Sequence, residues 1–164
     1  MYGRISFLRN TKLIGDISEI KIAAALVEAG YRVFFPFGEN HRYDLLAEDE
    51  SGSFHRIQVK TGRLRSGVIV FRCYSVHETP KGLIMQRYAG QIDYFGIYCP
   101  ENRQCYLVPV QHVGSNGYLR IQPCENAQRK KIRWAETYLI PSRGTEAVGG
   151  GAISGVSLGG LLPP

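Results

Sequence analysis

The chain has 164 residues, enough for one domain with a sizeable core but too few for two large domains. Its formal net charge is +6, which favours a polyanionic partner such as nucleic acid. The sequence has neither the apolar core of a signal peptide nor an apolar run long enough to span a bilayer. We therefore expect a cytoplasmic protein with no membrane partner.

Residues 11–29 predict the first helix, which is expected to end before Gly30. Apolar residues recur with helical spacing, and the side they form is expected to face the core: Ile20, Ala23, Ala24 and Val27. Glu19 lies at the edge of this stripe, where its carboxylate can reach a polar patch on a sheet. In the alternative interpretation, Asp16 and Glu19 form a capping box and Glu19 only satisfies the start of the helix.

The next pattern predicts a β-hairpin with arms at residues 43–48 and 54–61. The residues between the arms are turn formers. A hairpin centred near Ser51 places Asp44 roughly across from Gln58. The two arms therefore bring together polar residues that lie far apart in the sequence.

Polar chemistry gathers on one face of this hairpin. Gln58 and Lys60 share that face, because successive strand side chains point to opposite sides. A carboxylate at Asp44 beside the Gln58 amide can hold Mg²⁺, and the backbone carbonyl of Val59 adds a third oxygen. Lys60 can orient or deprotonate a water molecule, or neutralise charge on a phosphate. The pattern predicts phosphodiester hydrolysis; the alternative is a surface hairpin with scattered polar residues.

The order of these features resembles the PD-(D/E)XK nuclease superfamily. The resemblance covers residues 13–76 and rests on Gly15-Asp16-Ile17-Ser18-Glu19 before an apolar helix, on Tyr43-Asp44, and on Gln58-Val59-Lys60. The chain is most similar to the group I intron homing endonucleases with this fold, which use glutamine where most members have a carboxylate. Archaeal Holliday-junction resolvases are the second match. Gln58 replaces the usual Glu or Asp, and Arg42-Tyr43-Asp44 replaces Pro-Asp; a glutamine coordinates a cation with less charge.

The resemblance implies an α/β fold with a restriction-endonuclease-like core, in which a central mixed β-sheet is flanked by helices, one on each side. It implies Mg²⁺-dependent hydrolysis of double-stranded DNA, with Mn²⁺ as a substitute ion. The implied catalytic residues are Glu19, Asp44, Gln58 and Lys60. The implied metal ligands are Asp44, Gln58, the carbonyl of Val59, and Glu19. A homo-oligomer, either a dimer or a tetramer, is expected for double-strand cleavage.

Most of the remaining chain predicts strands, at residues 31–37, 68–76, 91–99, 104–110 and 118–121. Residues 77–90 predict a loop or a short helix, and residues 114–117 predict a turn. Pro109 indicates a strand end or a sheet edge.

Basic side chains near the predicted site and in the last predicted helix, residues 127–139, suggest contacts with the DNA backbone. These candidates are Arg42, Arg63, Arg65, Arg129, Lys130, Lys131 and Arg133. Ordinary alternatives exist for most of them. Residues 62–67 can be a simple basic turn, and the helix residues can form a solvated face.

The four cysteines include no C-x-x-C pair, which zinc sites usually show: Cys73, Cys99, Cys105 and Cys124. Cys99 and Cys105 flank a turn sequence, so we expect them to face each other across a hairpin. Reduced structural cysteines are the favoured interpretation. A zinc site built from these cysteines is the alternative.

Residues 1–142 predict a single nuclease-like domain, and residues 143–164 form a glycine-rich tail that we expect to be disordered. We interpret the protein as a metal-dependent endodeoxyribonuclease, site-specific and of the homing type. The alternatives are a nuclease like the Holliday-junction resolvases, a catalytically inactive DNA-binding module on the same fold, which Gln58 favours, and a zinc-dependent interaction domain.

Overall fold

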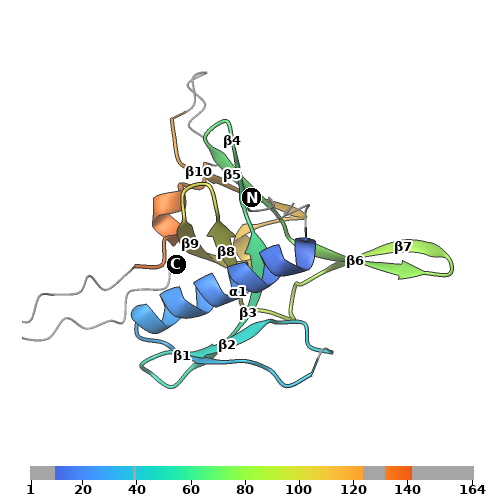
Figure 1. The fold of residues 1–164 in the computed structure, drawn as a ribbon, viewed down its shortest axis with the longest axis horizontal. Helices are drawn as coiled ribbons and strands as arrows, with labels where there is room; N and C mark the ends of the chain where they lie inside the picture. Colours follow the sequence, from blue (N-terminus) through green and yellow to red (C-terminus); the bar gives the residue numbers. More distant parts are fainter. Residues whose placement is uncertain (1–9, 39, 124–131, 142–164) are drawn as a thin grey trace, which may run out of the picture.

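The computed structural model describes residues 10–38, 40–123 and 132–141. Helix α1 (Thr11–Glu28) comes first, and the side chain of the N-cap residue Asn10 accepts a hydrogen bond from the backbone N–H of Leu13. The other elements are β1 (Arg32–Phe34), β2 (Leu45–Glu48), β3 (Phe54–Thr61), β4 (Arg63–Arg65), β5 (Val68–Arg72), β6 (Tyr74–Thr79), β7 (Gly82–Arg87), β8 (Tyr94–Cys99), β9 (Gln104–Pro109), η1 (Val110–His112), β10 (Asn116–Arg120) and η2 (Ala135–Tyr138). The strands form three sheets (Figure 1).

The central sheet has five strands in the order β1-β2-β3-β8-β9. Strands β3 and β8 run parallel, whereas the other neighbours are antiparallel, so the sheet is mixed. Helix α1 covers one face and buries Ile22 and Leu26 in a cluster that includes Ile57 and Val59 of β3. The predicted α/β class with a central mixed sheet is confirmed.

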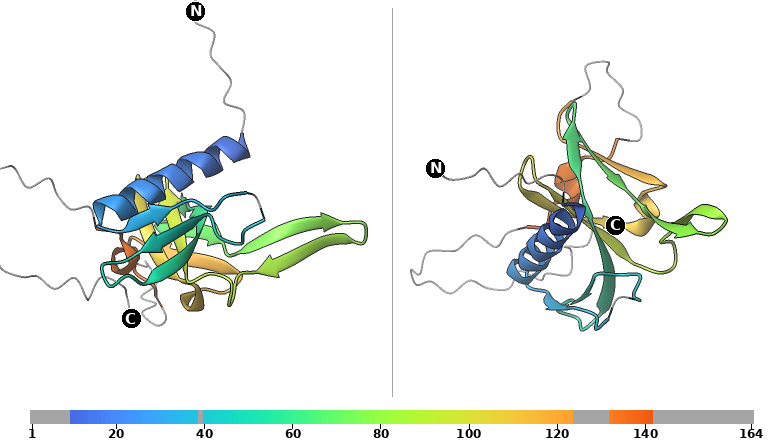
Figure 2. Two further views of the ribbon diagram at one scale, coloured as in Figure 1. Left: turned by 90° about the horizontal axis from the view of Figure 1, so that it is seen from below. Right: turned by 45° about the vertical axis from the view of Figure 1, so that its right-hand side comes forward.

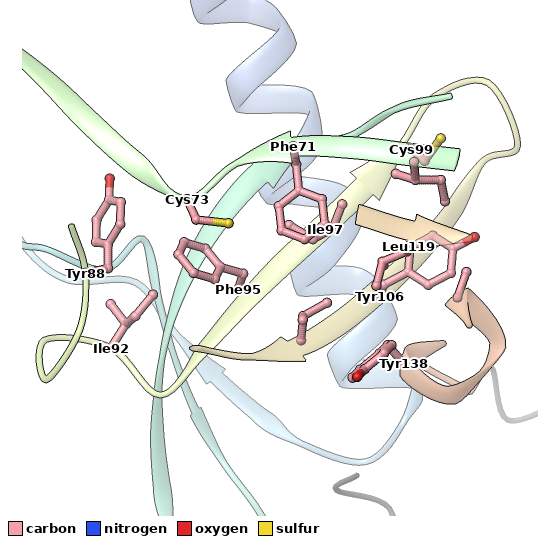
Figure 3. Close-up of a cluster of buried hydrophobic side chains, with 13 residues drawn as sticks. Phe71, Cys73, Tyr88, Ile92, Phe95, Ile97, Cys99, Tyr106, Leu119 and Tyr138 are labelled. Atoms are coloured by element: carbon pink, nitrogen blue, oxygen red, sulfur yellow. The ribbon is translucent and has the colours of Figure 1, made fainter. Parts of the chain in front are cut away.

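The other face of the central sheet is covered by a second sheet, in the order β10-β5-β4. Phe71 of β5 and Leu119 of β10 share a buried cluster with Phe95 and Ile97 of β8 (Figure 3). The expectation of a helix on each side is therefore wrong for the described residues. A sheet takes the place of the second helix, because β5 and β10 supply enough apolar surface to complete the core.

The β2–β3 hairpin has the predicted turn and register. Leu45 pairs with Ile57, and Glu48 pairs with Phe54, so the hairpin is centred on Ser51. The Asp49 carboxylate accepts hydrogen bonds from the backbone N–H groups of Ser51 and Ser53, at 2.9 and 3.0 Å. This Asx-type turn fixes the register and with it the position of Asp44.

Strands β6 and β7 form a two-stranded arm that projects from the body (Figures 1 and 2). Residues 77–90 were expected to be a loop or a short helix, and this expectation is wrong. The two strands pair from Tyr74–Arg87 to Thr79–Gly82, leaving only Pro80 and Lys81 in the turn. All six residues of β7 are exposed. The arm therefore lacks the buried face that makes a strand recognisable from its sequence.

The predicted last helix, residues 127–139, is also wrong where the structure describes it. Residues 124–131 lie outside the described residues. Residues 135–138 form only the 3-10 turn η2, with Trp134 bridged to Arg120 and Leu139 bridged to Tyr106. Pairing with both sheets overrides the helical spacing of Ile132, Ala135 and Leu139.

Smaller differences concern strand limits. The strand expected at residues 31–37 is only β1, and the one expected at 68–76 divides at Cys73 into β5 and β6. The expected turn at 62–67 contains β4 and a two-residue turn at Ser66 and Gly67, both with positive φ. The expected turn at 114–117 ends inside β10. Strand β9 lies at the sheet edge and ends at Pro109, as predicted.

Gly96 sets the distance between α1 and the central sheet. A Cβ atom there would lie 2.8 Å from Cγ2 of Ile22 and 3.2 Å from Cγ2 of Ile57. Gly96→Ala should therefore lower the free energy of unfolding by about 1–3 kcal/mol through overpacking. Denaturant unfolding followed by circular dichroism measures the change.

Gly15 of α1 is the matched control, because a Cβ atom there meets nothing within 4 Å. Gly15→Ala should raise the free energy of unfolding by up to about 1 kcal/mol through helix propensity. Equal effects of the two substitutions would contradict the close approach at Gly96.

Candidate active site

The Asp44 carboxylate lies where β2 and β3 begin to separate. The backbone N–H of Asp44 donates to the Ile57 carbonyl at 2.9 Å, which continues the hairpin ladder by one residue. Its Oδ2 accepts hydrogen bonds from Nε2 of Gln58 at 2.5 Å and from the backbone N–H of Val59 at 2.7 Å. The structure thus joins Asp44 and Gln58 across the hairpin, as the sequence predicts.

The backbone of Val59 adds a second feature. The N–H and C=O groups of one strand residue project from the same edge of that strand. Since the Val59 N–H meets Asp44, its carbonyl also projects towards the β2 side. A carboxylate and a carbonyl oxygen therefore lie on the same side of β3.

Lys60 lies on the same face of β3 as Gln58 and is held by Tyr88. The Lys60 Nζ donates to the Tyr88 hydroxyl at 3.2 Å and lies 5.1 Å from the centre of its ring. Tyr88 is 4 % exposed and packs edge-on against Phe95. The charge of Lys60 is close enough to Asp44 to lower the pKa of that carboxyl, although burial acts more strongly in the opposite direction.

Glu19 reaches the site from α1. The adjacent Ser18 is buried, and its hydroxyl lies 2.6 Å from that of Thr61, next to Lys60 in β3. This link holds the middle of α1 against the end of β3. The capping-box alternative is wrong, because Asn10 is the N-cap and Glu19 lies more than two turns into the helix.

The two carboxylates have perturbed acidity. Burial raises the pKa of Asp44 above its ordinary value, and hydrogen bonds from Val59 and Gln58 and the charge of Lys60 only partly offset this effect. Burial, followed by the charges of Asp44 and Asp16, raises the pKa of Glu19. Like charges that raise a pKa mark a place where a cation would be favourable.

The donor set fits a hard divalent cation. Asp44 and Glu19 would supply carboxylate oxygens to such an ion, and the Val59 carbonyl and the Gln58 amide oxygen would supply neutral ones. Among the described residues, no group of three or more His, Cys, Asp or Glu side chains is placed to hold a metal ion. The acidic side chains near each other here are Asp44 and Glu19, and Gln58 beside Asp44 adds an amide instead of a third carboxylate.

The cysteines do not add a metal site within the described residues. Cys73, Cys99 and Cys105 are free thiols, and Cys124 lies outside the described residues. Burial raises the pKa of Cys73 to about 12 and that of Cys105 to about 11, so both thiols stay protonated near neutral pH. Cys99 and Cys105 do not face each other, because Cys99 pairs with Gln104 and Cys105 pairs with Tyr98.

The predicted DNA-contact residues fall into three groups. Arg42 is engaged within the protein: its guanidinium stacks on the Tyr88 ring at 4.3 Å and donates to Gln91, Ser75 and the Arg87 carbonyl. Arg63, Arg65 and Arg133 are exposed, with Arg63 also 3.8 Å from Glu101. Arg129, Lys130 and Lys131 lie outside the described residues.

Three residues of this site were not predicted from the sequence: Ser18, Thr61 and Tyr88. Tyr88 comes from the segment between β7 and β8, and no local pattern links it to Lys60. Ser18 could have been found, because a hydroxyl at a helical position that faces a sheet needs a partner. Another acidic side chain of the described residues, Asp93, forms an ion pair with Arg56 at 3.0 Å.

The chain belongs to the PD-(D/E)XK endonuclease family, whose model matches residues 9–141. Five chains of known structure match it. One is a bacterial homing endonuclease, I-Ssp6803I: it is 24% identical, with a TM-score of 0.64, and the match covers 79% of this chain and 88% of that chain. Another is a Holliday junction resolvase, Hjc of Archaeoglobus fulgidus, 14% identical with a TM-score of 0.40; the match covers 65% of this chain and 84% of that one.

No curated protein matches the chain. The family named from the sequence is confirmed by the match of its model. No helix in the part of the chain that the structure describes is long and apolar enough to cross a membrane.

The raised pKa of Asp44 predicts how Asp44→Asn changes stability in EDTA. A raised folded-state pKa means that stability is present below the unfolded-state value, about 3.9, and is lost as the pH rises through the folded-state value. The amide introduced by Asp44→Asn cannot ionise, so the melting temperature of the variant should rise relative to the wild type between pH 4 and pH 8. Thermal unfolding across this range measures the difference.

Asp93→Asn is the control, because the pKa of Asp93 is lowered whereas that of Asp44 is raised. Burial acts to raise the pKa of Asp93, but the hydrogen bonds and charge of Arg56 outweigh it and leave the pKa lowered. Asp93→Asn should therefore lose stability relative to the wild type as the pH rises over the acidic range. If the Asp44→Asn curve stayed parallel to the wild type, the assigned environment of Asp44 would be wrong.

Proposed function

We propose that this protein is a metal-dependent endonuclease that hydrolyses phosphodiester bonds in double-stranded DNA. One observation carries the proposal: the Asp44 carboxylate, fixed by Gln58 and Val59, lies on the same strand pair as Lys60 and near Glu19 of α1. Membership of the PD-(D/E)XK endonuclease family supports the same chemistry.

In this proposal, the groups that would hold Mg²⁺, or Mn²⁺ in its place, are Asp44, Gln58, Glu19 and the Val59 carbonyl. A divalent ion bound there would stabilise negative charge on the phosphate oxygens during displacement. Lys60 orients the attacking water or takes its proton, with Tyr88 setting the position of its amine. Arg63, Arg65 and Arg133 are the exposed described candidates for backbone phosphates, and Arg129, Lys130 and Lys131 remain candidates from the sequence.

We further propose that the substrate is a specific duplex site, cut by a homo-oligomer, as for a homing endonuclease. The homing endonuclease of known structure supports this proposal through its shared fold. A resolvase-like activity on branched DNA is the alternative within the same chemistry. The discriminating substrates are a plasmid library, a panel of intronless gene fragments and a four-way junction.

A second candidate function is DNA binding without cleavage. It is favoured by Gln58, which leaves only two acidic side chains for a cation among the described residues. Salt-sensitive binding that persists in EDTA, with no cleavage of any substrate, would support this function over the first.

Removing the site's charges should abolish cleavage. Asp44→Ala and Lys60→Met are each expected to lower the cleavage rate in Mg²⁺ by at least about 100-fold, because they remove a ligand or the amine that positions the water. Gel analysis of the substrates above, with Mg²⁺ and with EDTA, measures the rates. Circular dichroism checks that both variants remain folded.

Lys81→Met is the control for Lys60→Met, since Lys81 is an exposed lysine in the β6–β7 turn. It should leave the cleavage rate per bound complex unchanged. Normal cleavage by either site variant would show that these residues are not catalytic.

Gln58→Glu tests whether position 58 is a metal ligand. The new carboxylate would lie beside that of Asp44, because the present amide is within hydrogen-bond distance of it. In EDTA at pH 8, repulsion and the lost hydrogen bond should lower the free energy of unfolding by about 1–3 kcal/mol. Mg²⁺ should then raise the melting temperature of Gln58→Glu by more than that of the wild type.

Gln58→Leu is the matched control, because it removes the amide without adding a charge. It should gain less stability from Mg²⁺ than the wild type does. If Mg²⁺ raised the melting temperatures of the wild type, Gln58→Glu and Gln58→Leu equally, position 58 would not be a metal ligand. The role of Asp44 would still be tested separately by Asp44→Ala.

A further inference from the structure

The guanidinium of Arg42 holds the segment that carries Tyr88 at three points. It donates to the backbone carbonyl of Arg87, immediately before Tyr88, at 3.3 Å. Its Nε donates to Oε1 of Gln91, which follows Tyr88 in the same turn, at 2.6 Å. Its Cζ also lies 4.3 Å from the centre of the Tyr88 ring. Arg42 therefore contacts the chain before, at and after this tyrosine.

The same tyrosine holds the Lys60 amine. The backbone carbonyl of Tyr88 accepts hydrogen bonds from the N–H groups of Gln91 and Ile92, at 2.9 and 3.3 Å, so a turn fixes its backbone. Phe95 packs edge-on against its ring (Figure 3). With the backbone and the ring held, the hydroxyl is fixed 3.2 Å from Nζ of Lys60. Whatever moves Tyr88 therefore also moves the hydrogen-bond partner of this amine.

The contacts of Arg42 depend on the planar shape of its guanidinium. Nε, Nη1 and Nη2 each donate to a different acceptor, and the acceptor of Nη1 is Oγ of Ser75, at 3.0 Å. Donors on one rigid fork set the orientation of the whole plane, which then stacks on the aromatic ring. The fork thus faces into the protein, so the charge of Arg42 has a structural use without any phosphate.

A lysine amine needs such support to act at a defined place. It is carried on a flexible four-carbon stem, so its position is set by what it contacts. A displacement of about 1 Å can cost about 100-fold in rate when a group must align with a reacting atom. Arg42 lies just before Asp44 in the chain, so it connects the segment of that carboxylate with the segment that holds the amine. The relative placement of the two groups therefore depends on Arg42.

We propose that Arg42 is a positioning residue, which holds the Lys60 amine in place through Tyr88. This role rests on the proposed nuclease function, because it is there that Lys60 acts on the attacking water. It differs from the phosphate contact expected from the sequence, in which the charge of Arg42 would act on DNA directly. The two roles predict different results for the same substitutions.

The first experiment measures how firmly the amine is held, without DNA or metal. Lysines are acylated at one fixed pH with an N-hydroxysuccinimide ester, and the rate at each lysine is followed by mass spectrometry. Arg42→Met and Tyr88→Phe should each raise the rate at Lys60 by about 5-fold, because each frees the amine from about one hydrogen bond. Lys81, in the exposed turn of the arm, is the internal reference. Circular dichroism checks that the variants remain folded.

Arg32→Met is the matched control, because Arg32 is an exposed arginine of β1 that donates to Glu48 at 3.0 Å. It should leave the rate at Lys60 unchanged. The double variant Arg42→Met/Tyr88→Phe tests whether Arg42 acts through the tyrosine. Its rate at Lys60 should equal that of either single variant, since both changes break the same link. Additive increases, or a wild-type rate in Arg42→Met, would overturn the inference.

The second experiment separates positioning from a phosphate contact. In Mg²⁺, Arg42→Met should lower the cleavage rate of bound duplex by at least about 10-fold, because the amine is displaced. In EDTA, its DNA affinity and the salt dependence of that affinity should match those of the wild type. Loss of a phosphate contact would instead weaken binding and reduce the salt slope by about 1, and this result would also overturn the inference. A wild type that cuts no DNA but shows the acylation results would reject the nuclease function and leave the link between Arg42 and Lys60 standing.

Discussion

The arrangement of the candidate site depends on how the Asp44 carboxylate is held at the end of the β2–β3 hairpin. Its Oδ2 accepts from the Val59 backbone and from the Gln58 amide, so one oxygen is committed to β3. The other oxygen is not needed for this anchoring. Because the anchor includes a backbone N–H group, one of its two hydrogen bonds does not depend on the side chain at position 58. The Asx turn at Asp49 sets this geometry from the far end of the hairpin, since it fixes the register.

Gln58 gives this site a different charge from one built on three acidic residues. A glutamate beside Asp44 would add repulsion in the absence of a cation, whereas the amide donates to Asp44 and stabilises its charged form. Burial nevertheless leaves the pKa of Asp44 raised, and burial together with the charge of Asp44 raises the pKa of Glu19. We therefore expect less charge repulsion here than among three carboxylates, and a weaker attraction for a cation. Metal affinity and stability without metal are expected to change in opposite directions at this position.

The parts of the fold predicted correctly are those determined by local chemistry. Turn formers centred on Ser51, with alternating residues on either side, were enough to place Asp44 across from Gln58. The predictions that proved wrong concern segments whose structure depends on residues far away in the sequence. The β6–β7 arm has no buried face to produce a pattern, and residues 132–139 pair with Arg120 and Tyr106 from separate sheets. Arg42 looked like a phosphate ligand because its partners Gln91, Ser75 and Tyr88 lie more than 30 positions away.

The incorrect choice of the α1 core side has a physical cause. Helical periodicity reports that a face is apolar, but it does not report what covers that face. Ile20 and Val27 fit the spacing of a helical stripe as well as Ile22 and Leu26 do. Only the sheet decides which pair is buried: it covers Ile22 and Leu26 and leaves Ile20 and Val27 exposed. A helix with one apolar face could be satisfied by the sheet alone. Helix α1 has two apolar faces, and among the described residues only the face with Ile22 and Leu26 packs on the sheet, so the pattern alone could not show which side of the helix is buried.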